Sequence, residues 1–313
     1  YSVSGNGILT YWVAPSVRTR RLVWVDRSGQ ELGQIGEPGT YSNVSLSPDG
    51  RYLLVSLPDE RAEGDDLWLK DLERGTTSRF TFDPADDAAS VWSPDGARVV
   101  FATNRSGTPD LYEKQSSGAG EAAPFLATPI PEWPTDWSND GKWIVGGQLV
   151  SGGNRTDLVA FPASGEGDPV PIANTRFHEF DAHLSPDGRW VAYGSLESGQ
   201  WEVYVQAFPE PQGKWQVSTR GGHNPRWRED GRELFYVTPD ARLMAVNVTT
   251  DATFRAGVPE ELFASSIAGG GFSLGRYHVV DNGERFLLRV GVSGGTVPPF
   301  TVVLNWASTL EEH

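Results

Sequence analysis

The chain has 313 residues, a formal net charge of −15, 36 glycines and 22 prolines, and 38% of its residues are hydrophobic. The acidic balance argues against binding to nucleic acid or to an anionic membrane surface, because both need a basic face. With no cysteine, the chain has no thiolate catalyst, no cysteine-ligated zinc and no disulfide. No run approaches the roughly 20 apolar residues of a membrane span, and there is no apolar leader, so we expect any signal or anchor to lie outside this chain.

A short turn motif recurs along the chain. Ser-Pro-Asp-Gly occurs at 47–50, 93–96 and 185–188, with a close variant at 138–141 and weaker copies at 4–7, 228–231 and 280–283. Proline presets the backbone of such a turn, aspartate bonds nearby N–H groups, and glycine accepts a positive φ. The glycines are separated by 43 to 52 residues, and such a period with four short strands is typical of β-propeller blades.

The strands are expected in the following chain order. The first segment supplies candidates at 1–4, 8–13, 22–25 and 31–35. Each later repeat has an inner strand ending at the turn, a second strand directly after it, a third strand that opens on an acidic residue, and a polar fourth strand. Second strands are expected at 52–55, 98–101, 190–193 and 234–237, third strands at 66–69, 110–112, 157–159 and 202–205, and fourth strands at 78–81 and 216–218. The last candidates are 277–280, 286–290 and 301–305.

This pattern predicts an all-β fold, a propeller of four-stranded antiparallel blades. About 27 strands are one short of seven sets of four, so seven blades are favoured, with six as the alternative. A six-bladed ring would leave about 40 residues outside it, and no linker-like stretch accounts for them. We expect one domain over 1–313, with repeat units at about 1–36, 37–82, 83–127, 128–174, 175–218, 219–264 and 265–313.

Two sets of repeated residues have expected structural roles. Large residues just before the turns should wedge between neighbouring blades: Leu46, Trp92, Trp137, Leu184 and Trp227. Acidic residues at the start of the third strands should tie neighbouring loops: Asp66, Asp110, Asp157 and Glu202.

Several phrases carry a family resemblance, among them 22–27, 66–68, 79–84, 203–209, 213–218, 225–228 and 301–306. With the repeated turns, they make the chain resemble the WD40-like propeller repeats of the TolB family, and more narrowly the propeller regions that lie C-terminal to bacterial Ser/Thr protein kinases. The resemblance implies an extracytoplasmic, periplasmic or cell-surface location and a place in a bacterial signalling protein. The chain itself has no His-Arg-Asp catalytic loop and no Asp-Phe-Gly motif.

Histidines point to a candidate binding site. Counted back from the turn, His183 and His278 share one inner-strand position with Asp136, Arg226, Ser45 and Val91. Inner strands border the channel of a propeller, so we expect His183, His223, His278, Asp136 and Arg226 at one polar cavity, and the same neighbourhood contains His178, Glu179, Asp181, Glu132 and Trp133. Such a cavity favours an anionic or hydroxylated ligand that pairs with Arg226.

Metal binding is an alternative at two places. Asp83, Asp86 and Asp87 put three carboxylates within five residues, which suits Ca²⁺ but also a solvated turn. The channel imidazoles and carboxylates could also hold a metal. No other cofactor is expected.

The sequence thus predicts a non-enzymatic recognition or sensor propeller that binds a partner protein or a small ligand at its central funnel or loops. Two alternatives stay open: a propeller enzyme of the lyase, lactonase or glycosidase type that uses channel histidines and carboxylates, and a structural or assembly module.

Overall fold

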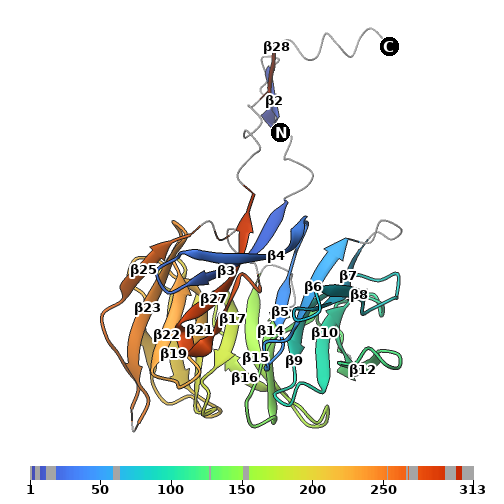
Figure 1. The fold of residues 1–313 in the computed structure, drawn as a ribbon. Coiled ribbons are helices and arrows are strands. Elements are labelled where there is room, and N and C mark those ends of the chain that lie inside the picture. The colour runs from blue at the N-terminus through green and yellow to red at the C-terminus, as the bar shows by residue number, and fades with distance from the viewer. Residues whose placement is uncertain are drawn as a thin grey trace.

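The computed structural model describes residues 2–3, 8–11, 19–58, 64–126, 128–150, 155–251, 253–265, 267, 274–292 and 301–304. All but three of its described strands form six antiparallel blades around one axis (Figure 1). The six inner strands contact one another in the cyclic order β5, β9, β13, β17, β21 and β26, and β26 contacts β5 again. The fold is therefore a propeller, as the repeats predicted, and its ring is closed.

Each blade runs outward from the axis through four successive strand positions. The inner strands are β5 (Val44–Leu46), β9 (Asp87–Trp92), β13 (Glu132–Trp137), β17 (Glu179–Leu184), β21 (His223–Trp227) and β26 (Tyr277–Val280). The second strands are β6 (Tyr52–Pro58), β10 (Arg98–Thr103), β14 (Trp143–Leu149), β18 (Trp190–Ser195), β22 (Glu233–Val237) and β27 (Arg285–Gly291). The third strands are β7 (Asp65–Asp71), β11 (Asp110–Gln115), β15 (Thr156–Pro162), β19 (Glu202–Ala207), β23 (Arg242–Thr249) and β3 (Arg20–Asp26). The outer strands are β8 (Thr76–Arg79), β12 (Ala123–Leu126), β16 (Val170–Ala173), β20 (Lys214–Gln216), the two short strands β24 (Arg255–Ala256) and β25 (Glu260–Ala264), and β4 (Glu31–Gly39).

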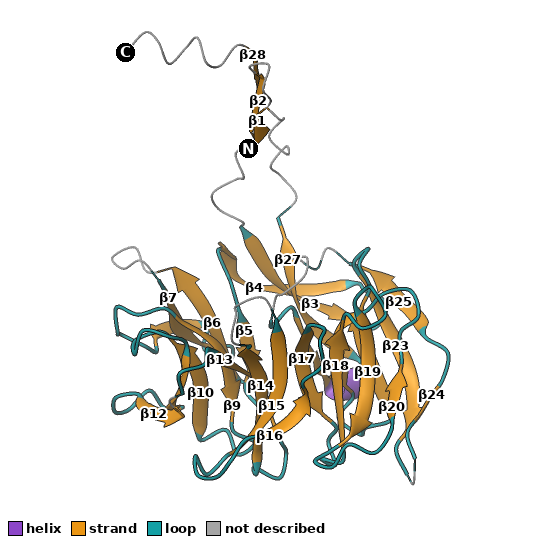
Figure 2. Ribbon diagram, turned by 180° about the vertical axis from the view of Figure 1, so that it is seen from behind, coloured by secondary structure: helices purple, strands orange, loops and turns teal. Residues whose placement is uncertain are grey.

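The expectation of seven blades is wrong, because the two ends of the chain build one blade together. β26 and β27 from the C-terminal part are completed by β3 and β4 from the N-terminal part, with Arg285 opposite Asp26 and Gly291 opposite Arg20. β1 (Ser2–Val3), β2 (Ile8–Tyr11) and β28 (Thr301–Leu304) form a separate three-stranded sheet that shares no strand with a blade. Figures 1 and 2 show this sheet apart from the ring. Since β3 occupies the free edge of β27, the ring closes at six blades.

The repeated motif forms the predicted hairpin turn between inner and second strands. In the first copy the Ser47 hydroxyl donates to Asp49 Oδ1 (2.6 Å), and Oδ1 also accepts the Arg51 N–H (3.1 Å). The Tyr52 N–H donates to Ser47 Oγ (2.8 Å), while Gly50 has φ +71°, a conformation that glycine adopts without strain. The serine–aspartate bond recurs at 93–95, 138–140 and 185–187, so one local structure opens the second strand of four blades.

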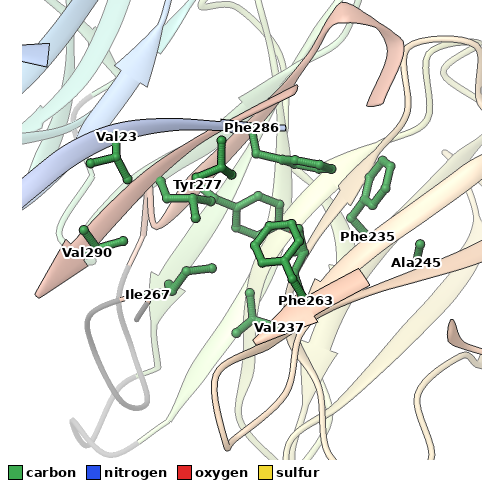
Figure 3. Close-up of a cluster of buried hydrophobic side chains, with 12 residues drawn as sticks. Val23, Phe235, Val237, Ala245, Phe263, Ile267, Tyr277, Phe286 and Val290 are labelled. Carbon is green, nitrogen blue, oxygen red and sulfur yellow. The ribbon is translucent and has the colours of Figure 1, made fainter. Parts of the chain in front are cut away.

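Hydrophobic clusters fill the boundaries between blades. In the boundary that β27 and β3 share with β22 and β23, the ring of Phe286 contacts Phe235 edge-on, with centroids 5.2 Å apart (Figure 3). Other boundaries are packed in the same way, and the large residues before the turns take part as predicted. The indoles of Trp92 and Trp227 each donate to a backbone carbonyl of the preceding blade, those of Ser45 (3.1 Å) and His183 (3.0 Å).

Two of the acidic residues of the third strands, Glu202 and Asp110, tie loops, as predicted. Glu202 is buried and accepts hydrogen bonds from the Ser218 hydroxyl, from the Gly221 N–H (3.0 Å) and from Gln200 Nε2 (2.7 Å). Asp110 accepts the Thr128 N–H (3.2 Å) in the equivalent loop. Asp66 and Asp157 pair with Arg79 (2.5 Å) and Arg155 (3.3 Å).

Candidate functional site

A cavity of about 660 Å³ lies at the axis, on the face that carries the motif turns. Turn residues of the successive blades surround its mouth, including Pro48, Pro94, Asn139, Pro186 and Asp281. We call this cavity the funnel. Its rim is built from tight turns on short hairpins, so the strands fix the position of every group at the mouth.

The wall of the funnel carries one residue from the same inner-strand position of each blade. In order around the axis these residues are Ser45, Val91, Asp136, His183, Arg226 and His278. The sequence register predicted this ring, and the structure brings Asp136, His183, Arg226 and His278 together at one cavity. Four adjacent blades therefore supply the charged and imidazole groups, whereas the other two supply a hydroxyl and an isopropyl group.

Asp181 connects the polar side of the wall. Its Oδ2 accepts hydrogen bonds from Arg226 Nη1 (2.9 Å) and from Asn224 Nδ2 (2.5 Å), and its Oδ1 lies 3.1 Å from His183 Nε2. The other ring nitrogen of His183 lies 3.7 Å from Asp136 Oδ2. Asp136 Oδ2 also accepts the Leu184 N–H (2.9 Å). The imidazole of His183 is thus held between two carboxylates.

The pKa values of the two wall histidines are shifted in opposite directions. Burial and Arg226 oppose the charging of His183, but Asp181 and Asp136 outweigh them and raise its pKa above the usual 6.5. Burial lowers the pKa of His278 to about 4, although its Nε2–H donates to the Val44 carbonyl (3.0 Å). Burial also opposes ionisation of Asp181, yet Arg226 and His183 lower the pKa of that carboxyl. His183 is consequently the histidine of the wall that gains a proton most readily.

Five other predicted residues lie outside the funnel lining, and β-bulges explain why. The inner strands shift register between Pro134 and Asp136, between Phe180 and His183, and between His223 and Arg226. Residues after these bulges line the funnel, while those before them do not: Glu132, Trp133, His178, Glu179 and His223. His223 Nδ1 instead lies 2.9 Å from Asn224 Oδ1, and burial lowers the pKa of this imidazole to about 4. The Trp133 indole lies against Phe180, with ring centroids 6.5 Å apart.

Glu132 and Glu179 occupy equivalent positions as the first residues of β13 and β17. Both are buried, and Oε2 of each accepts no hydrogen bond from the described part of the chain. Burial raises the pKa of Glu132 to about 7, with Thr128 opposing the shift and Asp110 adding to it. Burial also raises the pKa of Glu179. Both residues also contact the preceding blade: the Glu132 N–H donates to the Pro109 carbonyl (2.8 Å), and the Glu179 carbonyl accepts the Thr156 hydroxyl (2.6 Å).

The acidic segment predicted as a calcium site has other partners. Asp87 is buried and accepts two hydrogen bonds from Arg105 Nη2 (3.0 and 3.2 Å). Asp83 Oδ1 accepts the Ala85 N–H (3.0 Å), and Asp86 Oδ1 accepts the Asp65 N–H (2.8 Å). Within the residues that the structure describes, no three histidine or acidic side chains are grouped so that they could hold a metal ion.

Sequence reasoning missed a second layer of buried polar residues. Asn224 and Arg276 lie two residues before Arg226 and His278, at the same spacing that separates Asp181 from His183. Burial lowers the pKa of Arg276 to about 10, and the charge of Asp181 opposes this shift. Counting two residues further back from each turn would have found both positions.

One sequence pattern bears on hydrolase chemistry. Residues 271–275 read Gly-Phe-Ser-Leu-Gly, the letters of a nucleophile elbow, and 271–273 lie outside the described residues. An elbow needs a strand before the serine and a helix after it. Here the next element is strand β26, which starts at Tyr277. The Gly-x-Ser-x-Gly motif is therefore followed by a strand and not by the helix that a nucleophile elbow requires.

Comparisons with known proteins agree with this architecture. No family model matches the chain. A segment of 72 residues, 23% of this chain, is 35% identical to the Tol-Pal system protein TolB of Helicobacter pylori and spans 16% of that protein's length. The structure of a putative TolB from Agrobacterium tumefaciens superposes with a TM-score of 0.68 at 19% identity, over 88% of this chain and 99% of that one. TolB from Acinetobacter baumannii superposes with a TM-score of 0.60, also at 19% identity, over 82% of this chain and 65% of that one.

The class of protein is therefore a six-bladed β-propeller with a central funnel. More narrowly, its propeller is TolB-like, because two TolB structures share its fold and a curated TolB shares part of its sequence. The matched segment is short relative to that curated protein, and the structural identities are low, so the likeness is one of fold. In the part of the chain that the structure describes, no helix is long and apolar enough to cross a membrane.

Proposed function

We propose that this chain is a non-enzymatic recognition propeller whose funnel receives part of a partner protein. The observation that carries the proposal is the funnel itself, a cavity of about 660 Å³ whose wall takes one residue from every blade. Concave sites with a few convergent polar groups are the usual places where proteins bind ligands.

The construction of the wall supports binding rather than packing. Polar groups are gathered on one side of it, and the buried network around Asp181 holds them in place through hydrogen bonds. The TolB-like fold supports a protein partner, since the H. pylori relative is named as a component of the Tol-Pal system. Alternatively, the same funnel binds a small ligand.

We place the chain outside the cytoplasm, as part of a bacterial signalling protein. This placement rests on the resemblance to TolB-type repeats and to the propellers that follow bacterial Ser/Thr kinases. It predicts that the gene encodes an anchor or an export signal, which sequencing of the surrounding reading frame tests.

Blocking the funnel tests the proposed function. Val91 lines the wall and Asn139 lies exposed at the mouth, so Val91→Trp and Asn139→Trp both add bulk to the funnel. Leu32, on the outer strand β4, is exposed and gives the control Leu32→Trp. Proteins of the native envelope are captured on the purified chain after cross-linking, and each variant is first checked for an unchanged melting temperature.

The expected result is a captured protein that wild type and Leu32→Trp retain and that both funnel variants lose. Asn139→Trp keeps the test usable if Val91→Trp fails to fold. A partner that all variants retain would bind elsewhere on the propeller, and the proposal would then be wrong.

A further inference from the structure

We propose that the funnel takes a cationic side chain, a lysine or arginine in an extended segment of the partner, and that Asp136 is the group that holds it. The inference rests on the proposed function and adds the chemistry of the bound group. It follows from which charges of the wall are already paired and which remain exposed to a ligand.

Arg226 has its counterion inside the wall. Its Nη1 donates to Asp181 Oδ2 (2.9 Å) and to the Pro225 carbonyl (2.7 Å), and both side chains of the ion pair are largely buried. A carboxylate at this distance neutralises the guanidinium, so an incoming anion would have to compete with Asp181. The anionic ligand expected from the sequence depended on a free Arg226, which the structure does not provide.

Asp136 is more exposed than the Arg226–Asp181 pair. Its side chain is 28% exposed, whereas those of Asp181 and Arg226 are 1% and 10% exposed. Oδ2 accepts one backbone hydrogen bond, from the Leu184 N–H. Its one ion-pair partner among the described residues is His183, at 3.7 Å, and His183 lies closer to Asp181, at 3.1 Å, so Asp136 shares this imidazole and has no lysine or arginine of its own. A carboxylate has room for several donors, so the exposed side of Asp136 can accept a ligand's N–H groups.

At the mouth of the funnel, as in the wall, the arginines are paired with acidic residues. Arg285 pairs with Asp281 (3.0 Å), and Arg228 pairs with Asp230 (2.7 Å), so both rim arginines already have acidic partners. Asp49 accepts hydrogen bonds from its own turn, chiefly from the Ser47 hydroxyl, and these lower the pKa of the Asp49 carboxyl. The Asp49 carboxylate at the entrance is therefore ionised, and it attracts a cation approaching the funnel.

The less polar side of the wall suits the rest of such a side chain. Ala89 and Val91 line it, with Ser45 in the next blade. Lysine and arginine carry three or four methylene groups below the charge, and these stems pack on apolar surface while the head stays polar. One side of the funnel can thus hold the stem while Asp136 holds the head.

Three small compounds that differ in charge test this assignment. They are Nα-acetyl-L-arginine amide, its neutral analogue Nα-acetyl-L-citrulline amide, and the anionic Nα-acetyl-L-glutamate amide, each titrated into the full chain and followed by NMR. Asp136→Asn keeps the shape and the acceptor for Leu184 while removing the charge. Asp168→Asn removes the same charge at an exposed position outside the funnel and is the matched control.

We expect the arginine compound to bind about tenfold more tightly than the citrulline compound, as a charge-assisted hydrogen bond implies. Asp136→Asn should abolish this difference, and Asp168→Asn should leave it intact. The assignment is overturned if the glutamate compound binds best, if Asp136→Asn has no effect, or if the arginine compound fails to bind at tens of millimolar. In each case the proposed function still holds if Val91→Trp and Asn139→Trp lose the captured partner. If these two variants retain the partner, the proposed function itself is wrong.

Discussion

The buried carboxyl of Glu132 allows a quantitative prediction about stability and pH. Glu132 is 2% exposed, and burial raises its pKa from 4.5 to about 7 in the folded protein. Between these two values the folded state binds a proton that the unfolded state has released, so the free energy of unfolding falls as the pH rises. The pKa difference corresponds to about 3 kcal/mol as an upper bound, and screening reduces it, so we expect a loss of about 2 kcal/mol.

Glu132→Gln removes this titration and keeps the size of the side chain. The variant should match wild type near pH 4.5, where both carry an uncharged group, and should exceed wild type by about 2 kcal/mol above pH 7. Urea unfolding followed by tryptophan fluorescence at a series of pH values measures the difference. Glu166→Gln, at an exposed position of the β15–β16 connection, is the control and should keep the wild-type profile. Parallel curves for wild type and Glu132→Gln would refute the reasoning, because the carboxyl would then have the same pKa in both states.

Three further measurements follow from the fold and the network. Asp110→Ala should lower the free energy of unfolding by about 1–2 kcal/mol, since the loop hydrogen bonds to Ser106 and Thr128 are lost; an unchanged melting temperature would mean that the tie has no energetic role. Phe286→Ala should cost about 3–5 kcal/mol, because its buried ring fills the boundary beside β3; a loss below about 1 kcal/mol, the level of a surface substitution, would contradict the packing described. NMR titration should show His183 titrating above 6.5 and His278 near 4, and the reverse order would contradict the two-carboxylate setting of His183.

The local parts of the fold could be predicted from the sequence. A Ser-Pro-Asp-Gly turn depends on contacts within a few residues, such as that of Ser47 with Asp49, so each copy predicts its hairpin independently of the rest of the chain. The strand candidates were accurate for the same reason. The ends of most predicted strands fall within a few residues of those observed.

The blade count could not be predicted in this way. The strand patterns of 8–13 and 301–305 resemble those of 22–25 and 286–290, yet only the second pair enters the ring. The number of blades is decided by the pairing of β27 with β3, whose paired residues are more than 250 positions apart in the sequence. Strand propensity carries no information about such a partner.

The sequence predicted correctly the site residues that lie between the β-bulge of each inner strand and the turn that follows it. Counting back from the turn placed Asp136, His183, Arg226 and His278 correctly, because the strand is regular over those two residues. Beyond that point the extra residue of each bulge changes the register. Asp181, at a bulge, has φ +56° and meets His183 and Arg226 at once, a geometry that alternation alone does not give.

The shared blade also has a mechanical consequence. Arg20 and Gly291 face each other at one end of the antiparallel pair β3–β27, so the chain enters and leaves the ring at the same point. Force that pulls the two flanking segments apart would break the hydrogen bonds of this pair one after another, beginning at Arg20 and Gly291, rather than all at once. Among the six blades, the one that β3 and β27 share would separate first under load, and the rate of that opening would set how long the propeller endures force.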